Sequence, residues 1–120
     1  MGALKVHSVD GKGKLSEECV WLSVSADIPS LSYFLLCDTT YLDEGHISNE
    51  LRHMYWFKPK AVKEGDWIRV YTKNGTNTSV VNDKKTTTHI FYWNLGATVW
   101  NKDGDAAILF DLTTWKSTKV

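Results

Sequence analysis

The chain has 120 residues, of which 42% are hydrophobic and 12% aromatic, and its 14 basic and 14 acidic side chains give zero formal net charge. The aromatic content argues against a disordered chain, and the zero net charge disfavours a general nucleic-acid binder, whose affinity depends on a basic excess. No apolar run reaches the roughly 18 residues of a membrane span, and residues 1–14 lack the apolar core of a signal peptide. We therefore expect one soluble, cytoplasmic domain over residues 1–120.

The N-terminal third of the chain predicts short strands separated by turns. Residues 4–9 alternate between apolar and polar side chains and lead into a glycine-rich turn, as a half-buried strand does. Residues 18–24 also alternate, and one face of this strand should carry Val20, Leu22 and Val24. Residues 31–37 are almost continuously apolar, as expected for a central strand. Cys19 and Cys37 lie in these runs, and without an export signal we expect free thiols, with a disulfide between neighbouring strands as the alternative.

The segment Asp38–Met54 interrupts the strand pattern. Its apolar residues are spaced at five, four and three positions: Leu42, Ile47, Leu51 and Met54. Such spacing is compatible with a short amphipathic helix over residues 47–54, so we expect one helical or irregular insertion between strands. The insertion also holds the densest cluster of titratable side chains, namely Asp43, Glu44, His46 and Glu50. A solvated loop accounts for this cluster, and metal binding or hydrolysis is the alternative.

The strand pattern resumes after the insertion. Residues 55–58 form a short aromatic segment that Pro59 ends, because proline cannot donate to a central ladder. A turn at 63–66 then precedes residues 67–73, which alternate strictly. One face of this strand carries Ile68, Val70 and Thr72, and the other carries Trp67, Arg69, Tyr71 and Lys73.

The C-terminal third contains a long polar stretch and two further strand patterns. Residues 74–88 are mostly polar, so we expect a mobile loop. Residues 89–93 form an aromatic strand, and Asp103–Asp105 is a turn of the hairpin type that leads into residues 106–112. Short strands separated by regular turns predict an all-β fold, a β-sandwich of seven to nine strands.

The most specific pattern is a tryptophan-asparagine pair followed by a glycine-aspartate turn and an alternating strand, formed by Trp100, Asn101, Gly104, Asp105, Ala107, Leu109 and Asp111. Together with Gly65–Gly75 and strand patterns along almost the whole chain, it resembles the signature of the lamin tail domain. This resemblance implies an immunoglobulin-like β-sandwich. Three features differ from the family pattern: Leu31–Phe34 replaces a Leu-Ser-Gly-Trp-like element, the insertion is longer, and Thr113–Thr114 stands where a glycine turn is usual.

Catalytic and metal-binding patterns are weak. Asn101–Asp105 has oxygen ligands at alternate positions, but Leu112 occupies the place where a calcium loop of the EF-hand type needs a glutamate. The four histidines, His7, His46, His53 and His89, are too scattered for a zinc module. No nucleophile elbow or phosphate-binding loop is present. We therefore expect no enzymatic activity, no metal and no cofactor.

The most suggestive surface combines aromatic and basic residues, namely Trp67, Arg69, Tyr71 and Lys73 on one strand face with Lys84 and Lys85 in the following loop. The face could simply cover a second layer or subunit. Tryptophan, tyrosine and arginine dominate protein interfaces, so we expect a protein-binding module that uses this face or the Asp38–Met54 insertion. Nucleic-acid binding is the alternative, because aromatics can stack on bases while cations contact phosphates.

Overall fold

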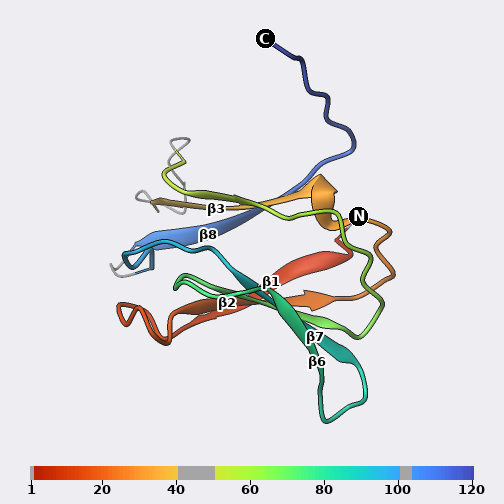
Figure 1. Ribbon diagram of the computed structural model, residues 1–120, viewed down its shortest axis with the longest axis horizontal. Coiled ribbons are helices and arrows are strands. Elements are labelled where there is room, and N and C mark those ends of the chain that lie inside the picture. The colour runs from red at the N-terminus through yellow and green to blue at the C-terminus, as the bar shows by residue number, and fades with distance from the viewer. Residues whose placement is uncertain (1, 41–50, 101–103) are drawn as a thin grey trace.

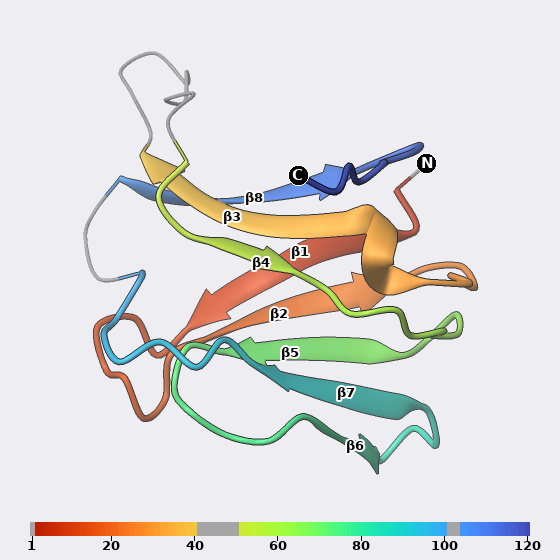
Figure 2. The same ribbon diagram turned by 45° about the horizontal axis from the view of Figure 1, so that its top comes forward.

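The alternating segments form strands of two sheets (Figure 1). The computed structural model describes residues 2–40, 51–100 and 104–120, and in this part of the chain the fold is all-β with one short helix, η1 (Leu31–Tyr33). The larger sheet has five strands in the order β1 (Leu4–Asp10), β2 (Cys19–Val24), β5 (Trp67–Tyr71), β7 (Thr87–Tyr92) and β6 (Thr78–Val81). The smaller has three, in the order β4 (Met54–Trp56), β3 (Phe34–Thr40) and β8 (Asp105–Asp111) (Figure 2). The expected β-sandwich is confirmed.

Among the strands of the described residues, all pairs are antiparallel except β5 and β7, which run parallel with Trp67 opposite Thr88 and Tyr71 opposite Tyr92. This exception follows from the chain path. After β5 the chain turns back to make β6 one strand position away, and β7 then returns into the gap, antiparallel to β6 and parallel to β5 (Figure 2). The larger sheet therefore holds together strands from both halves of the chain.

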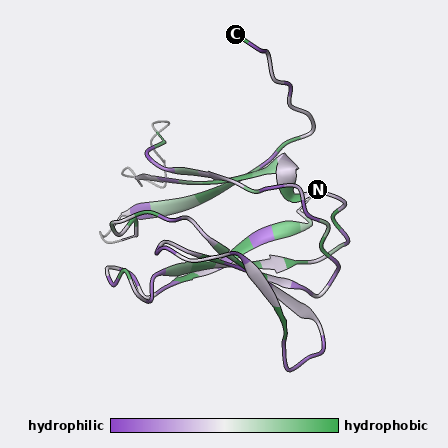
Figure 3. Ribbon diagram, viewed as in Figure 1, coloured by the Kyte–Doolittle hydropathy of each residue, from purple (hydrophilic) through white to green (hydrophobic). Residues whose placement is uncertain are grey.

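The core lies between the two sheets, and the predicted inward faces are confirmed. Val20, Leu22 and Val24 of β2 are buried, as are Ile68 and Val70 of β5. The smaller sheet contributes Leu36, helix η1 contributes Leu31, and the segments after β4 and before β8 add Phe57 and Trp100. Figure 3 shows hydrophobic stretches along strands of both sheets. Burying one such hydrophobic side chain stabilises the fold by about 1.5–3 kcal/mol. Because apolar residues alternate along each strand, this burial determines which face of each sheet points toward the core.

Three expectations need correction or fall outside the described residues. Residues 51–53 have no regular structure and Met54 opens β4, so the helix expected over 47–54 is wrong at its C-terminal end; residues 41–50 lie outside the described part. The expected mobile loop 74–88 contains β6 and a tight turn. The turn at Asp103–Asp105 was expected to form a hairpin, but residues 101–103 are not described and β8 pairs with β3 rather than with the preceding segment.

Both cysteines are buried free thiols, as expected. Burial, together with the charge of the neighbouring Asp38, raises the pKa of Cys37 to about 11. Within the described residues no helix has the length and apolar character needed to span a membrane. Trp100 belongs to the core cluster, with 2% of its surface exposed.

Candidate interaction surface

The strand register gathers aromatic side chains on the outer surface of the larger sheet. Trp21 of β2 stands opposite Arg69 of β5, and Tyr71 of β5 stands opposite Tyr92 of β7. Since neighbouring strand residues point to opposite sides of a sheet, Trp67 shares the side of Arg69 and Tyr71 while Ile68 and Val70 enter the core. We call the surface formed by Trp21, Trp67, Arg69, Tyr71 and Tyr92 the outer face.

Arg69 is clamped at the centre of the outer face. Its guanidinium carbon lies 4.7 Å from the ring centroid of Trp21 and 4.4 Å from that of Tyr71. Its Nε donates to the sulfur of Cys19 at 3.3 Å, which places the guanidinium over this buried thiol. The two ring contacts are cation–π interactions, each contributing about 0.5–2 kcal/mol depending on exposure. The side chain of Arg69 therefore packs between two aromatic rings and a buried thiol.

Tyr71 extends this arrangement toward β7. Its ring stacks on that of Tyr92 with centroids 5.4 Å apart and an interplanar angle of 16°. The ammonium group of Lys73 lies 4.5 Å from the centroid of Tyr71. Burial raises the pKa of the Tyr71 hydroxyl, although the charge of Arg69 opposes the shift. The ring of Tyr71 thus has aromatic and cationic neighbours that come from the protein itself.

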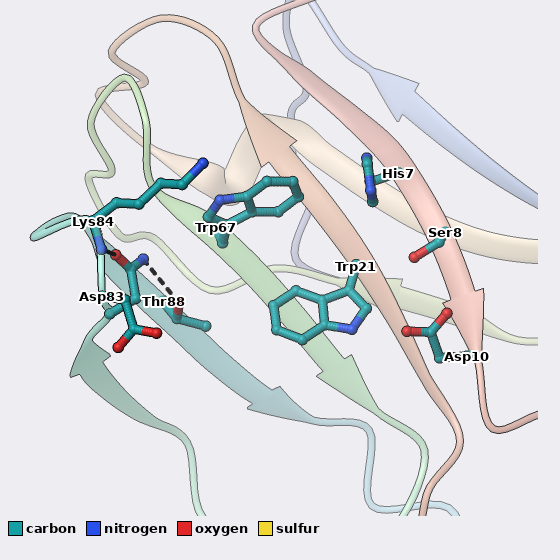
Figure 4. A pocket seen from close by; sticks show the side chains of 9 residues that line it. His7, Ser8, Asp10, Trp21, Trp67, Asp83, Lys84 and Thr88 are labelled. Atoms are coloured by element: carbon teal, nitrogen blue, oxygen red, sulfur yellow. Dashed lines mark hydrogen bonds between the residues drawn. The ribbon is translucent and has the colours of Figure 1, made fainter.

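A cleft of about 400 Å³ lies on the same side of the larger sheet, with Trp21 and Trp67 among its lining residues (Figure 4). It shares Trp21 with the contacts of Arg69, but Arg69 itself does not line it. The two indoles meet edge to face, with centroids 6.1 Å apart and an interplanar angle of 86°. Polar residues surround them. His7, Ser8 and Asp10 come from β1, whereas Asn82, Asp83, Lys84 and Thr88 come from the β6–β7 turn and β7. We call this feature the indole cleft.

The β6–β7 turn positions the loop residues of the predicted surface. The side-chain oxygen of Asn82 accepts hydrogen bonds from Lys84 N at 3.1 Å, Thr86 N at 3.2 Å and the Thr86 hydroxyl at 3.0 Å. Lys85 adopts a positive φ of 62° in this turn, a conformation that favours glycine or asparagine. Lys84 consequently lines the indole cleft, but Lys85 does not.

The structure therefore brings together five of the six predicted surface residues. Trp67, Arg69 and Tyr71 form the outer face, Lys73 joins it through Tyr71, and Lys84 joins it through the indole cleft. Sequence reasoning missed the contributions of Trp21, Tyr92 and Asp10. The outward position of Trp21 was evident from strand alternation, but its contact with Arg69 depends on which strands are neighbours.

A second site feature, absent from the sequence predictions, is a chain of polar side chains at the β6 edge. Asp66 Oδ2 lies 2.9 Å from His89 Nε2, and the other ring nitrogen of His89 lies 3.5 Å from the Ser79 hydroxyl, which accepts from Lys60 Nζ at 2.8 Å. The order resembles a hydrolytic triad. The 3.5 Å separation is at the limit of hydrogen bonding. These contacts connect β6 to β7, to the turn before β5 and to Lys60.

The carboxylate of Asp66, at one end of this series of polar side chains, also accepts hydrogen bonds from the backbone. Burial by itself would raise the pKa of its carboxyl group, but the hydrogen bonds from His89, Lys63 N and Thr87 N, with the charge of His89, lower the pKa below its usual value. The backbone bonds are 3.0 Å and 3.1 Å long. Asp66 thus connects the turn before β5 to the start of β7.

Glu18 is a second buried carboxylate that joins distant segments. Each of its oxygens accepts two hydrogen bonds: Oε1 from Gly13 N and Trp100 N, and Oε2 from the Thr72 hydroxyl and Val99 N. Glu18 is 0% exposed. The carboxylate holds the β1–β2 loop, the end of β5 and the segment before β8 together beneath the outer face.

The Asp38–Met54 insertion is tied at both ends. Asp38 Oδ1 accepts from His53 N at 2.6 Å, and Arg52 bonds to Asp105 at 3.0 Å and approaches Asp38 at 3.5 Å. The titratable cluster predicted in the insertion, Asp43, Glu44, His46 and Glu50, lies outside the described residues. Within the described part, no group of three histidine, cysteine or acidic residues is placed to hold a metal ion.

Comparisons with family models, curated proteins and solved structures give no match for this chain. The candidate surface is therefore identified from the contacts and burial of its residues.

Proposed function

We propose that the chain is a non-enzymatic binding module of the lamin-tail-like, immunoglobulin-like type, which recognises a protein partner through the outer face. The observation that carries this proposal is the clamp of Arg69 between Trp21 and Tyr71 beside the indole cleft. Tryptophan, tyrosine and arginine are the residue types that dominate binding energy at protein interfaces, and they act best when held rigid before binding. Here all three types meet on one half-buried surface.

Binding through nucleobase stacking is a weaker explanation of the same residues. Tyr71 already contacts Tyr92 and two cations, and Trp21 contacts Arg69, so these rings offer less free area to a base. Asp10 and Asp83 at the indole cleft would repel a phosphate backbone. The zero formal net charge adds no long-range attraction to nucleic acid.

The test replaces one tryptophan of the outer face and compares it with an exposed tryptophan of the other sheet. Trp67→Ala should reduce recovery of a partner from an extract of the source cells, measured by photo-crosslinking and mass spectrometry, by about tenfold or more. Trp56→Ala is the matched control, because Trp56 is 52% exposed on β4 of the smaller sheet. Equal recovery with the two variants would contradict the proposal.

Nucleic acid is tested directly by fluorescence anisotropy with single-stranded and duplex DNA at low salt. We expect no saturable binding. Salt-sensitive binding that Arg69→Glu abolishes would replace the protein partner with a nucleic acid.

A further inference from the structure

The two arginines of the chain have different electrostatic environments. Arg52 pairs with Asp105 at 3.0 Å and with Asp38 at 3.5 Å. Arg69 contacts two rings and one sulfur, and makes no ion pair with any residue of the described ranges 2–40, 51–100 and 104–120. Arg69 is thus a half-buried cation whose countercharge is not provided by the described part of the chain.

A half-buried cation of this kind is suited to bind an anion. Part of its hydration is lost to the surrounding rings, and partly buried charges are normally paired. Its Nε is used by Cys19, whereas its terminal nitrogens donate to no acceptor among the described residues. Guanidinium donors in a fixed plane match the two oxygens of a carboxylate. Because the rings of Trp21 and Tyr71 already hold the side chain, little further conformational freedom is lost on binding.

We propose that Arg69 is a preformed receptor for a carboxylate, and that the partner presents an aspartate or glutamate side chain to it. This inference rests on the proposed function and specifies the chemistry of that partner. Lys73, which lies over the same Tyr71 ring, adds a second positive charge. The indole cleft shares Trp21 with the guanidinium contacts, so it can receive a large side chain that follows or precedes the acidic residue.

A side-chain carboxylate fits the surroundings of Arg69 better than the phosphate of a nucleic acid does. Among the described residues, Arg69 and Lys73 place positive charge at the Tyr71 ring and Lys84 places it at the indole cleft, which also contains Asp10 and Asp83. A single acidic residue can reach Arg69 while its neighbours avoid the two aspartates. A phosphate chain would bring repeated negative charge across the whole face.

The experiment follows the Nε–Hε signals of the ¹⁵N-labelled full chain by NMR, since the sequence contains just the two arginines Arg52 and Arg69. The probe is the capped peptide Gly-Ser-Glu-Trp-Ser-Gly, and the control peptide has Gln in place of Glu. We expect the Arg69 signal to shift with a dissociation constant on the order of 1 mM and the Arg52 signal to stay in place. The Gln peptide should bind about fivefold to tenfold more weakly.

Two variants make the outcome specific to the guanidinium. Arg69→Lys retains the charge but loses the planar fork, so it should weaken the Glu peptide about as much as the Gln substitution does. Arg52→Lys should leave peptide binding unchanged. Peptide binding to Arg69→Lys and Arg52→Lys is followed through backbone amide resonances of the labelled chain. The same resonances report whether each variant is folded.

Three outcomes would overturn the carboxylate receptor: equal binding of the Glu and Gln peptides, no shift of the Arg69 signal at about 10 mM peptide, or stronger binding of a short oligothymidylate than of the Glu peptide. If the first occurs while Trp67→Ala still prevents partner capture, the outer face remains a protein-binding surface and the carboxylate receptor alone is wrong. If Trp67→Ala also has no effect, the proposed function is wrong as well.

Discussion

Replacement of Glu18 by glutamine tests the buried carboxylate that joins three segments. Each oxygen of Glu18 accepts two hydrogen bonds, from Gly13 N and Trp100 N on one side and from the Thr72 hydroxyl and Val99 N on the other. An amide has only one oxygen, so its NH₂ group must face two donors in either orientation.

The energetic cost depends on which oxygen is replaced. If NH₂ faces Thr72, that hydroxyl can rotate and accept a hydrogen bond, which leaves Val99 N–H unsatisfied. If it faces the other side, two backbone N–H groups lose their acceptor. A buried unsatisfied polar group costs about 1–3 kcal/mol, and hydrogen bonds to a charged group are the stronger ones. Glu18→Gln should therefore lower the free energy of unfolding by about 2–4 kcal/mol.

Urea unfolding followed by tryptophan fluorescence measures this loss of unfolding free energy. The same substitution should lower the midpoint of thermal unfolding by roughly 10 °C in a chain of this size. The matched control is Glu17→Gln, because Glu17 is the exposed neighbour and its side chain is not engaged by the Glu18 network. We expect the control to stay within about 0.5 kcal/mol of the wild type. An equally small effect of Glu18→Gln, with an unchanged denaturant slope, would refute the hydrogen-bonding argument.

Three further predictions concern other parts of the fold. Because the pKa of Asp66 is lowered in the folded state, its carboxylate stabilises the fold above its unfolded pKa of about 3.9 and this contribution is lost as the pH falls through the lower folded value. Asp66→Asn should therefore flatten the fall in unfolding free energy as the pH decreases below about 4, and a slope equal to that of the wild type would contradict this. Burial and a pKa of about 11 should keep the Cys37 thiol unreactive toward a disulfide reagent near neutral pH until urea unfolds the chain, and rapid labelling of the native protein at this residue would show otherwise. A Cβ added at Gly75 would overlap the Tyr92 ring, so Gly75→Ala should destabilise the fold by about 1 kcal/mol or more and shift the Tyr92 ring signals in NMR. Gly96→Ala, which has no atom within 4 Å of the added Cβ, should not shift them.

Strand faces could be predicted from the sequence because alternation is a local property. Ile68 and Val70 enter the core and Trp67 faces outward, as the pattern of residues 67–73 predicts. The same local reasoning failed for β6. Its four residues, Thr78–Val81, are all exposed, so they carry no inward apolar face that would distinguish a strand from a polar loop.

Contacts between strands distant in the sequence could not be predicted in this way. Arg69 stands beside Trp21 only because β2 and β5 are neighbours, and no alternation pattern identifies strand neighbours. In the sequence, nothing distinguishes Glu18 from a solvent-exposed acidic residue. Its hydrogen-bond partners Thr72 and Val99 lie 54 and 81 positions away, so no local pattern reveals its burial. The residue types on β5 thus predicted part of the candidate surface, whereas the contacts of Arg69 with Trp21 and the hydrogen bonds of Glu18 depend on the tertiary structure.

The position of β7 between β5 and β6 also has a consequence for synthesis of the protein. The ribosome synthesises β5 and β6 before β7, which lies between them. Neither strand can complete its backbone hydrogen bonds until β7 has been synthesised. The stacking partner of Tyr71, Tyr92, arrives with the same segment. On a ribosome, the surface that we propose for recognition is therefore unfinished until β7 has emerged, so a chain interrupted before that point cannot present the complete face to a partner.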